Sequence, residues 1–132
     1  MAKTFDDLLD YCYQSGLEVT KTNKEDGMII VAAEQRGISN MMIDCEEKLV
    51  LMEQPLYKVT NPSLAHFKKL LMLNRSLVHG AFVLDSSGQW VIFRDTLELE
   101  NLDYNEFEGS INALGLGLAE FSQELLDLNQ KG

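Results

Sequence analysis

Residues 61–97 constrain the fold most strongly, because the spacing of their apolar residues changes abruptly in the middle. In the first half, apolar residues recur at three- and four-residue steps, which predicts a helix with one apolar face. Asn61 is a candidate N-cap and Pro62 suits the first helical position. The predicted buried face consists of Leu64, Phe67, Leu70, Leu71 and Asn74.

The second half predicts a β-hairpin after a sharp corner at Gly80. Two β-rich runs, Ala81 to Leu84 and Gln89 to Phe93, flank the sequence Asp85-Ser86-Ser87-Gly88. This sequence is typical of a turn, and Gly88 can supply the positive φ that such a turn needs. A helix followed by a hairpin is therefore the unit on which the other elements pack. Trp90, in the second run, is expected to cover the core.

The N-terminal half predicts one helix and then a meander of three or four antiparallel strands. Thr4 and Asp7 have the spacing of a capping box at the start of the helix. Residues 28–33 are apolar on both faces, which predicts a strand buried on both sides. Pro55 is expected to end the last strand, because proline cannot donate a hydrogen bond to the ladder. The predicted strands begin near Leu17 and cover residues 28–33, 38–45 and 48–54.

The chain closes with a long predicted helix, for which Asp103 is the candidate cap. Its apolar stripe is Tyr104, Phe107, Ile111, Leu114, Leu118, Phe121, Leu125 and Leu128. Two interpretations stay open: the stripe packs on the chain's own sheet, or it forms part of a dimer seam. Gly115 and Gly117 predict either a kink or the close approach of a neighbour. The order of elements is typical of one α+β domain, residues 1–132, with an antiparallel sheet and the order α-β-β-β(-β)-α-β-β-α.

The charge excludes several classes of partner. Twenty-one acids against eleven bases give a net charge of −10, which repels nucleic acids and anionic membrane surfaces but suits a neutral or basic protein partner. The two cysteines show no disulfide or CxxC pattern, and the N-terminus lacks the apolar region of a signal peptide. These features predict a cytoplasmic protein without integral membrane association.

No catalytic or metal-binding motif is evident. His66 and His79 lack zinc-ligand spacing and are interpreted as surface or corner residues. Cys12 lies on an apolar helix face, and the acids around Cys45 should raise its pKa. The expectation is no enzyme activity, no cofactor and no metal. Four methionines, Met28, Met41, Met42 and Met52, fall in the predicted sheet and could fill a core or form an adaptable binding surface.

The central unit and the start of the last helix carry a family resemblance. The relevant residues are Leu70-Leu71, Asn74, Gly80-Ala81, Leu84-Asp85, Gly88, Val91, Phe93, Leu102-Asp103 and Phe107. Their pattern resembles type III secretion chaperones of the CesT class and their YbjN-like relatives, and the sequence is also similar to the uncharacterised YjfI-like bacterial proteins. Some YjfI-like proteins are encoded beside PspA-type membrane-stress proteins.

The resemblance implies a non-enzymatic protein, commonly a homodimer, that holds a segment of a partner protein against its sheet and first helix. The partner-binding positions expected from it are Phe5, Leu9, Met28, Ile30, Met41, Ile43, Leu49 and Leu51. Two alternatives remain: an accessory regulator of PspA-type membrane-stress machinery, and a small-ligand binder or enzyme of unknown chemistry.

Overall fold

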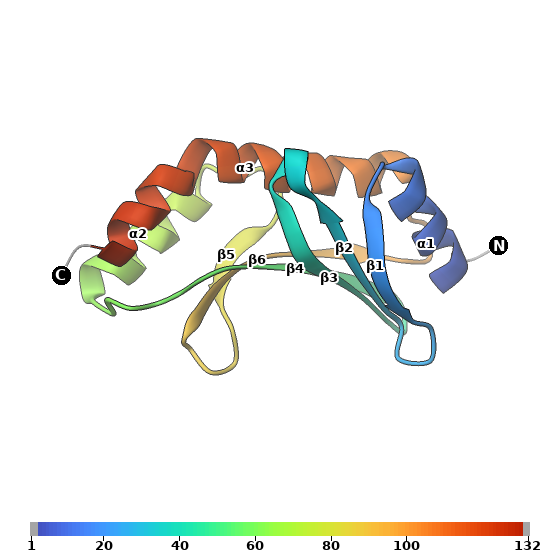
Figure 1. The fold of residues 1–132 in the computed structure, drawn as a ribbon, viewed down its shortest axis with the longest axis horizontal. Helices are drawn as coiled ribbons and strands as arrows, with labels where there is room; N and C mark the ends of the chain where they lie inside the picture. Colours follow the sequence, from blue (N-terminus) through green and yellow to red (C-terminus); the bar gives the residue numbers. More distant parts are fainter. Residues whose placement is uncertain (1–2, 131–132) are drawn as a thin grey trace.

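The helices all pack on one side of a curved antiparallel sheet, as the computed structural model of the chain shows for residues 3–130 (Figure 1). Helix α3 runs along the length of the sheet, with α1 at one end and α2 at the other. The elements are α1 (Phe5–Gln14), β1 (Glu18–Asn23), β2 (Met28–Ala33), the short 3₁₀ helix η1 (Glu34–Arg36), β3 (Ile38–Glu46), β4 (Leu49–Lys58), α2 (Leu64–Asn74), β5 (Ala81–Leu84), β6 (Trp90–Glu98) and α3 (Tyr104–Gln130). The predicted α+β class and order of elements are confirmed.

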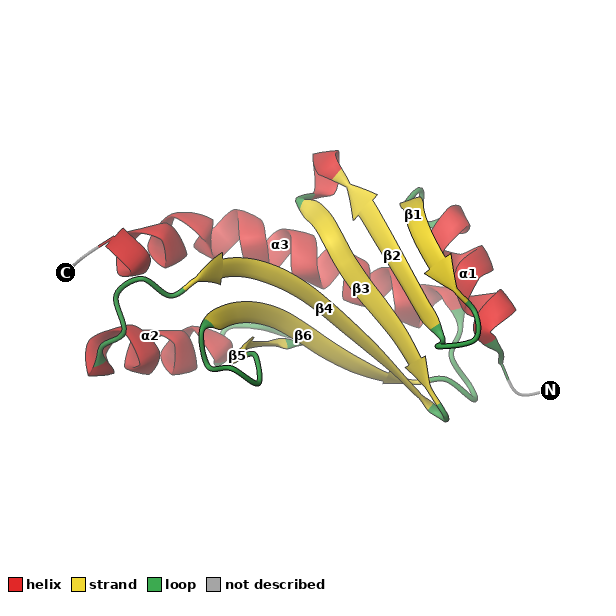
Figure 2. Cartoon of the chain, turned by 60° about the horizontal axis from the view of Figure 1, so that its bottom comes forward, coloured by secondary structure: helices red, strands yellow, loops and turns green. Residues whose placement is uncertain are grey.

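The sheet has six strands in the order β1-β2-β3-β4-β6-β5 (Figure 2). The first four form the predicted meander of consecutive antiparallel neighbours. The chain then leaves β4, passes through α2, and returns as the β5–β6 hairpin, in which β6 pairs with β4. Gly88 has the expected positive φ of 73° in the hairpin turn.

The core lies between the sheet and the helices. Alternate side chains of the strands point into it, so that Ile29 and Val31 of β2 are fully buried. Helix α3 covers them with its apolar stripe, of which Phe107, Ile111 and Leu114 are at most 1% exposed. The stripe therefore packs on the chain's own sheet.

Glycines in α3 allow neighbours to come close to the helix, and the helix continues through them without interruption. A Cβ atom added to Gly117 would lie 3.1 Å from the side chain of Leu77, and one added to Gly115 would lie 3.2 Å from the carbonyl oxygen of Arg36. The structure therefore shows the close approach of neighbouring residues at Gly115 and Gly117, and not a kink in the helix.

The start of α2 differs from the prediction. Ser63 is the N-cap, and its hydroxyl accepts a hydrogen bond of 3.1 Å from the backbone N–H of His66. The helix is rotated relative to the predicted face, since Leu64 and Leu71 are 85% and 71% exposed whereas Leu70 is 6% exposed. The helix buries His66, Leu70 and Leu73.

Pro55 does not end β4, which continues to Lys58 with a register shift after the proline. The pairing of β4 with β3 has already stopped at Glu53, so Pro55 pairs with β6 alone. A proline is tolerated where its nitrogen need not donate to a neighbouring strand. Beyond Glu53, the side chain of Gln54 takes the place of the backbone hydrogen bonds between β4 and β3. Its amide accepts from the N–H of Ser39 and donates to the carbonyl oxygen of Ser39.

Candidate functional site

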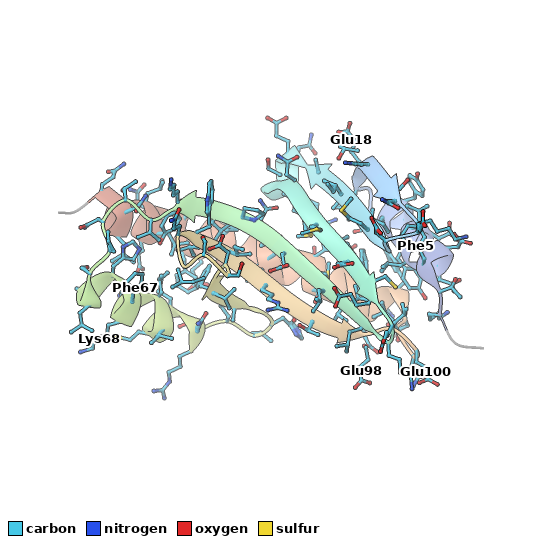
Figure 3. The ribbon with its side chains drawn as sticks, turned by 90° about the horizontal axis from the view of Figure 1, so that it is seen from below. Phe5, Glu18, Phe67, Lys68, Glu98 and Glu100 are labelled. Atoms are coloured by element: carbon cyan, nitrogen blue, oxygen red, sulfur yellow. The ribbon has the colours of Figure 1, made fainter. Side chains whose placement is uncertain are left out.

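The side of the sheet opposite the helices is the candidate binding surface, and we call it the open face. Seen from below, the strands present side chains on this side with no helix in front of them (Figure 3). The register identifies the members, because residues paired across neighbouring strands point to the same side. The apolar members are Met28, Ile30, Met42, Leu49, Leu51, Pro55, Ala81, Val83, Trp90 and Ile92.

Strand β2 is therefore not buried on both sides as predicted. Ile29 is fully buried against the helices, whereas Met28 and Ile30 lie half-buried on the open face. Trp90 also differs from its prediction, since it lies on the open face with 41% of its surface exposed. The four methionines divide evenly, because Met41 and Met52 are in the core and Met28 and Met42 are on the open face.

The open face brings together four of the eight predicted partner-binding residues: Met28, Ile30, Leu49 and Leu51. Met41 and Ile43 point to the other side and are 2% and 0% exposed, so neither is accessible in this conformation. Phe5 and Leu9 are half-buried on α1, where they pack against the core rather than beside the open face. Val83 and Ile92 are not among the predicted partner-binding positions, and Met42 is named only as one of four methionines that could line a core or a surface. For Met42 the reason is that residues 41–43 are apolar at every position and show no alternation.

Acidic side chains share the open face with the apolar ones. Asp44 pairs with Met28 on one side and with Leu51 on the other. Glu46 and Glu98 both pair with Leu49, at the end of the sheet where Figure 3 labels Glu98. The pKa of Glu46 is raised, first by a hydrogen bond with the side chain of Asp44 and then by the charge of Asp44.

Basic residues on this face are few. Arg94 pairs with Glu53, and its Nε lies 4.0 Å from a Glu53 carboxylate oxygen. Lys21 lies opposite Ile30 on the edge strand β1, and Lys58 lies opposite Trp90 at the far end of β4. The part of the face around Leu49 and Leu51 is therefore predominantly acidic and apolar.

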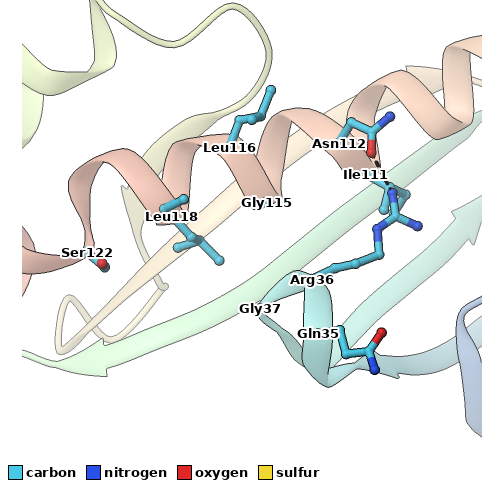
Figure 4. Close-up of a pocket in the computed structure, with 10 residues that line it drawn as sticks. Gln35, Arg36, Gly37, Ile111, Asn112, Gly115, Leu116, Leu118 and Ser122 are labelled. Atoms are coloured by element: carbon cyan, nitrogen blue, oxygen red, sulfur yellow. Dashed lines mark hydrogen bonds between the residues drawn. The ribbon is translucent and has the colours of Figure 1, made fainter.

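A groove lies on the other side of the molecule, between η1 and α3, with a volume of about 580 Å³ (Figure 4). Its main polar side chain, Arg36, is already engaged in the structure. The guanidinium donates to the carbonyl oxygen of Ser15 at 2.9 Å, to Glu108 at 2.6 Å and to Asn112 at 2.7 Å. These bonds tie α1, η1 and α3 together, so Arg36 has a structural role here.

Three titratable groups of the kinds often used in catalysis are buried, hydrogen-bonded or raised in pKa, whereas His79 is exposed. His66 is 1% exposed rather than on the surface; its Nδ1 lies 3.0 Å from the carbonyl oxygen of Asn61 and its Nε2 lies 2.8 Å from the hydroxyl of Tyr57. Burial raises the pKa of the Cys12 thiol to about 12. The pKa of Cys45 is raised by burial and then by the charge of Asp44, the direction that was expected. Within residues 3–130, no cluster of His, Cys, Asp and Glu has the arrangement of a metal site.

A second exposed apolar surface lies on α2. Leu64, Leu71 and Met72 are 85%, 71% and 59% exposed, and their spacing places them on one side of the helix. Val78, just beyond the helix, is 88% exposed. Lys68 lies among these residues on α2 and points away from the sheet (Figure 3). None of the helices in residues 3–130 combines the length and apolarity needed to span a bilayer.

Comparison with known proteins identifies relatives by sequence pattern and by fold. A family model named CesT_Tir_1 matches residues 1–131. The fold is similar to YbjN from E. coli, with 14% identity, a TM-score of 0.70, and coverage of 91% of this chain and 92% of YbjN. No curated protein matches the chain significantly in sequence.

Two further structures of similar fold are complexes. A chain of the heterodimeric complex ExoU–SpcU from the type III secretion system of Pseudomonas aeruginosa shares 19% identity, with a TM-score of 0.64 and coverage of 92% of this chain and 96% of that one. A chain of the HopA1–SchA chaperone–effector complex shares 12% identity, with a TM-score of 0.61 and coverage of 93% and 94%. At these identities the similarity shows the fold.

Proposed function

This chain belongs to the CesT_Tir_1 family, and we propose that it is a cytoplasmic, non-enzymatic, chaperone-like protein that holds a segment of a partner protein on the open face. The open face is the observation that carries the proposal. An antiparallel sheet can leave one side to solvent, but that side is then usually polar. Here β2, β3, β4, β6 and β5 each contribute at least one apolar side chain to the open face.

The composition of the open face suits a segment without one fixed sequence. Met28 and Met42 are flexible and polarisable, so they can adapt to different apolar side chains. Leu49 and Trp90 are 44% and 41% exposed and would become buried on binding. Apolar contact of this kind contributes roughly 25 cal/mol for each Å² removed from water. The two complexes of similar fold, one of them a chaperone with its effector, support a protein as the partner.

Site-specific cross-linking tests this proposal. A photoreactive amino acid placed at Met42 should capture the partner in cells, and the same group at Leu116 provides the matched control because Leu116 is exposed on α3, away from the sheet. A partner captured at Met42 and lost in an Ile30→Asp variant would support binding on the open face. Equal capture at both positions would contradict it.

The exposed side of α2 supports a second part of the proposal, that the protein is a homodimer. Leu64, Leu71 and Met72 form an apolar surface that a monomer would leave in water, and such surfaces commonly mark interfaces. Light scattering should give the mass of a dimer for the wild type and of a monomer for Leu71→Lys. A monomeric wild type, or a Leu71→Lys variant that stays dimeric, would contradict the role given to α2.

A further inference from the structure

Resting on the proposed function, we infer that the partner segment held on the open face carries lysine or arginine side chains among its apolar residues. The carboxylate of Asp44 is the starting point. In the register of the sheet it lies between Met28 and Leu51, two apolar residues that a bound segment has to cover. A segment lying over these two side chains must also cover Asp44.

A covered carboxylate needs a partner. Taking a charge out of water without an opposite charge or hydrogen bonds is strongly unfavourable, and a cation on the incoming segment removes this penalty. The protein supplies no cation for Asp44 among its neighbours in the register, which are Met28 and Leu51. Arg94 on β6 pairs with Glu53, with its Nε 4.0 Å from a Glu53 carboxylate oxygen; its charge lowers the pKa of Glu46, but by less than Asp44 raises it.

The surroundings of Asp44 strengthen this requirement. Glu46 lies two residues along β3 on the same side, and the Asp44 side chain raises its pKa. Glu98 lies across Leu49 from Glu46. A cation placed between these carboxylates would relieve their mutual repulsion while its apolar neighbours contact Met28, Leu49 and Leu51. Charge complementarity therefore selects a basic apolar segment over a neutral or acidic one.

Three matched peptides test this inference with the full-length protein. They share repeated triplets of two apolar residues and one variable residue, which is lysine, glutamine or glutamate. Calorimetric titration should give a dissociation constant for the lysine peptide about tenfold lower than for the glutamine peptide, the factor expected for one charge-assisted contact. The glutamate peptide should bind most weakly, and added salt should reduce the differences.

Two variants localise the effect. Asp44→Asn should raise the dissociation constant of the lysine peptide about tenfold and leave that of the glutamine peptide nearly unchanged. Glu120→Gln removes the same charge from α3, outside the open face, and should change neither value. Thermal unfolding monitored by circular dichroism should confirm that both variants are folded.

The outcomes separate the inference from the proposal beneath it. The lysine and glutamine peptides could bind with equal affinity and both be captured by the photoreactive amino acid at position 42. That result would overturn the inference and leave the proposed function intact. An equal effect of Asp44→Asn and Glu120→Gln would overturn it as well, because the preference would then follow net charge alone. If no peptide binds or cross-links at Met42, both the inference and a segment-binding role for the open face are wrong.

Discussion

Met42 and Ile43 are neighbours in β3 but point to opposite sides of the sheet, and substituting each by alanine should separate stability from binding. Ile43 is fully buried beneath the helices. Removing most of its side chain leaves a cavity, and such substitutions cost about 2–5 kcal/mol. For a chain of this length, a loss of about 3 kcal/mol lowers the melting temperature by about 10 °C.

Met42→Ala should behave differently because its side chain is half-buried on the open face. The folded protein loses only part of the transfer free energy of methionine, about 1 kcal/mol or less. The lower β-propensity of alanine affects both variants in a similar way, so it does not alter the comparison. A binding surface that uses Met42, in contrast, should lose about 1 kcal/mol or more of binding free energy.

The assay has two parts for each variant. Urea unfolding followed by circular dichroism gives the free energy of unfolding, and titration with the lysine peptide gives the affinity. Ile43→Ala should lose stability and, at a temperature where it is folded, keep its affinity. Similar losses of stability in the two variants would refute the assignment of the two sides of β3, and undiminished affinity in Met42→Ala would remove Met42 from the binding surface.

Four further predictions concern the supporting structure. Gly80 and Gly88 both have a φ of +73°, so replacing either by alanine strains the backbone, at a cost of about 1–2 kcal/mol for Gly88→Ala. Gly80→Ala should cost more, because its new Cβ atom would lie only 2.5 Å from the ring of Phe93. Urea unfolding measures the free energy of unfolding of both variants. Arg36→Lys loses the guanidinium fork that joins α1, η1 and α3, and should lower the free energy of unfolding by about 1–2 kcal/mol in the same assay. Hydrogen bonds at the N-cap of α1 lower the pKa of Asp7 below 3.8 in the folded protein, so its ionised form stabilises the fold at neutral pH. This contribution is lost as the pH falls through the lowered pKa. Asp7→Asn should therefore be less stable than the wild type at pH 7, and the difference in the free energy of unfolding should shrink as the pH is lowered below 3.8. Because its thiol is buried with a pKa of about 12, Cys12 should react with iodoacetamide only as fast as the protein unfolds, which mass spectrometry of the alkylated peptides can follow.

Local signals in the sequence were sufficient for most of the fold. The change of period around Gly80, the hairpin turn before Gly88 and the stripe of the last helix each depend on neighbouring residues, and the structure confirms all three. At the first helix, the N–H of Thr4 donates to the Asp7 carboxylate at 2.8 Å, as the capping-box spacing predicts. Such features follow from residues within one or two turns of each other.

Helix α2 shows where local signals fail. Its sequence holds leucines on more than one side, so spacing alone does not determine which side is buried. The structure buries His66 because Tyr57, at the end of β4, and the carbonyl of Asn61 together satisfy both ring nitrogens. The ring also stacks between Tyr57 and Phe67, with centroids 5.9 Å and 5.5 Å apart. Tyr57 belongs to a different element, and this pairing depends on how β4 meets α2 in the folded chain.

The binding surface shows a similar limit. Residues 41–43 are Met-Met-Ile, so the strand would bury apolar side chains whether Met42 or its two neighbours faced the helices. The sequence alone therefore does not say which of these residues point to the helices. The register with β2 decides it, since Ile30 pairs with Met42 and Ile29 with Ile43. Asn40, with a φ of +52° just before this run, accompanies a shift in the register between β2 and β3.

The same apolar run explains why the open face can serve as a binding surface. A strand with apolar residues on one side only would satisfy the core and leave a polar face to solvent. Strand β3 instead places Met42 on the open face and Ile43 in the core, and β2 does the same with Ile30 and Ile29. The stability of the monomer requires only the apolar residues in the core. The apolar residues on the open face are therefore not explained by the fold of the monomer. Its position around Asp44, which itself lacks a cation among its cross-strand neighbours, is explained if a basic apolar segment completes the sheet's second side.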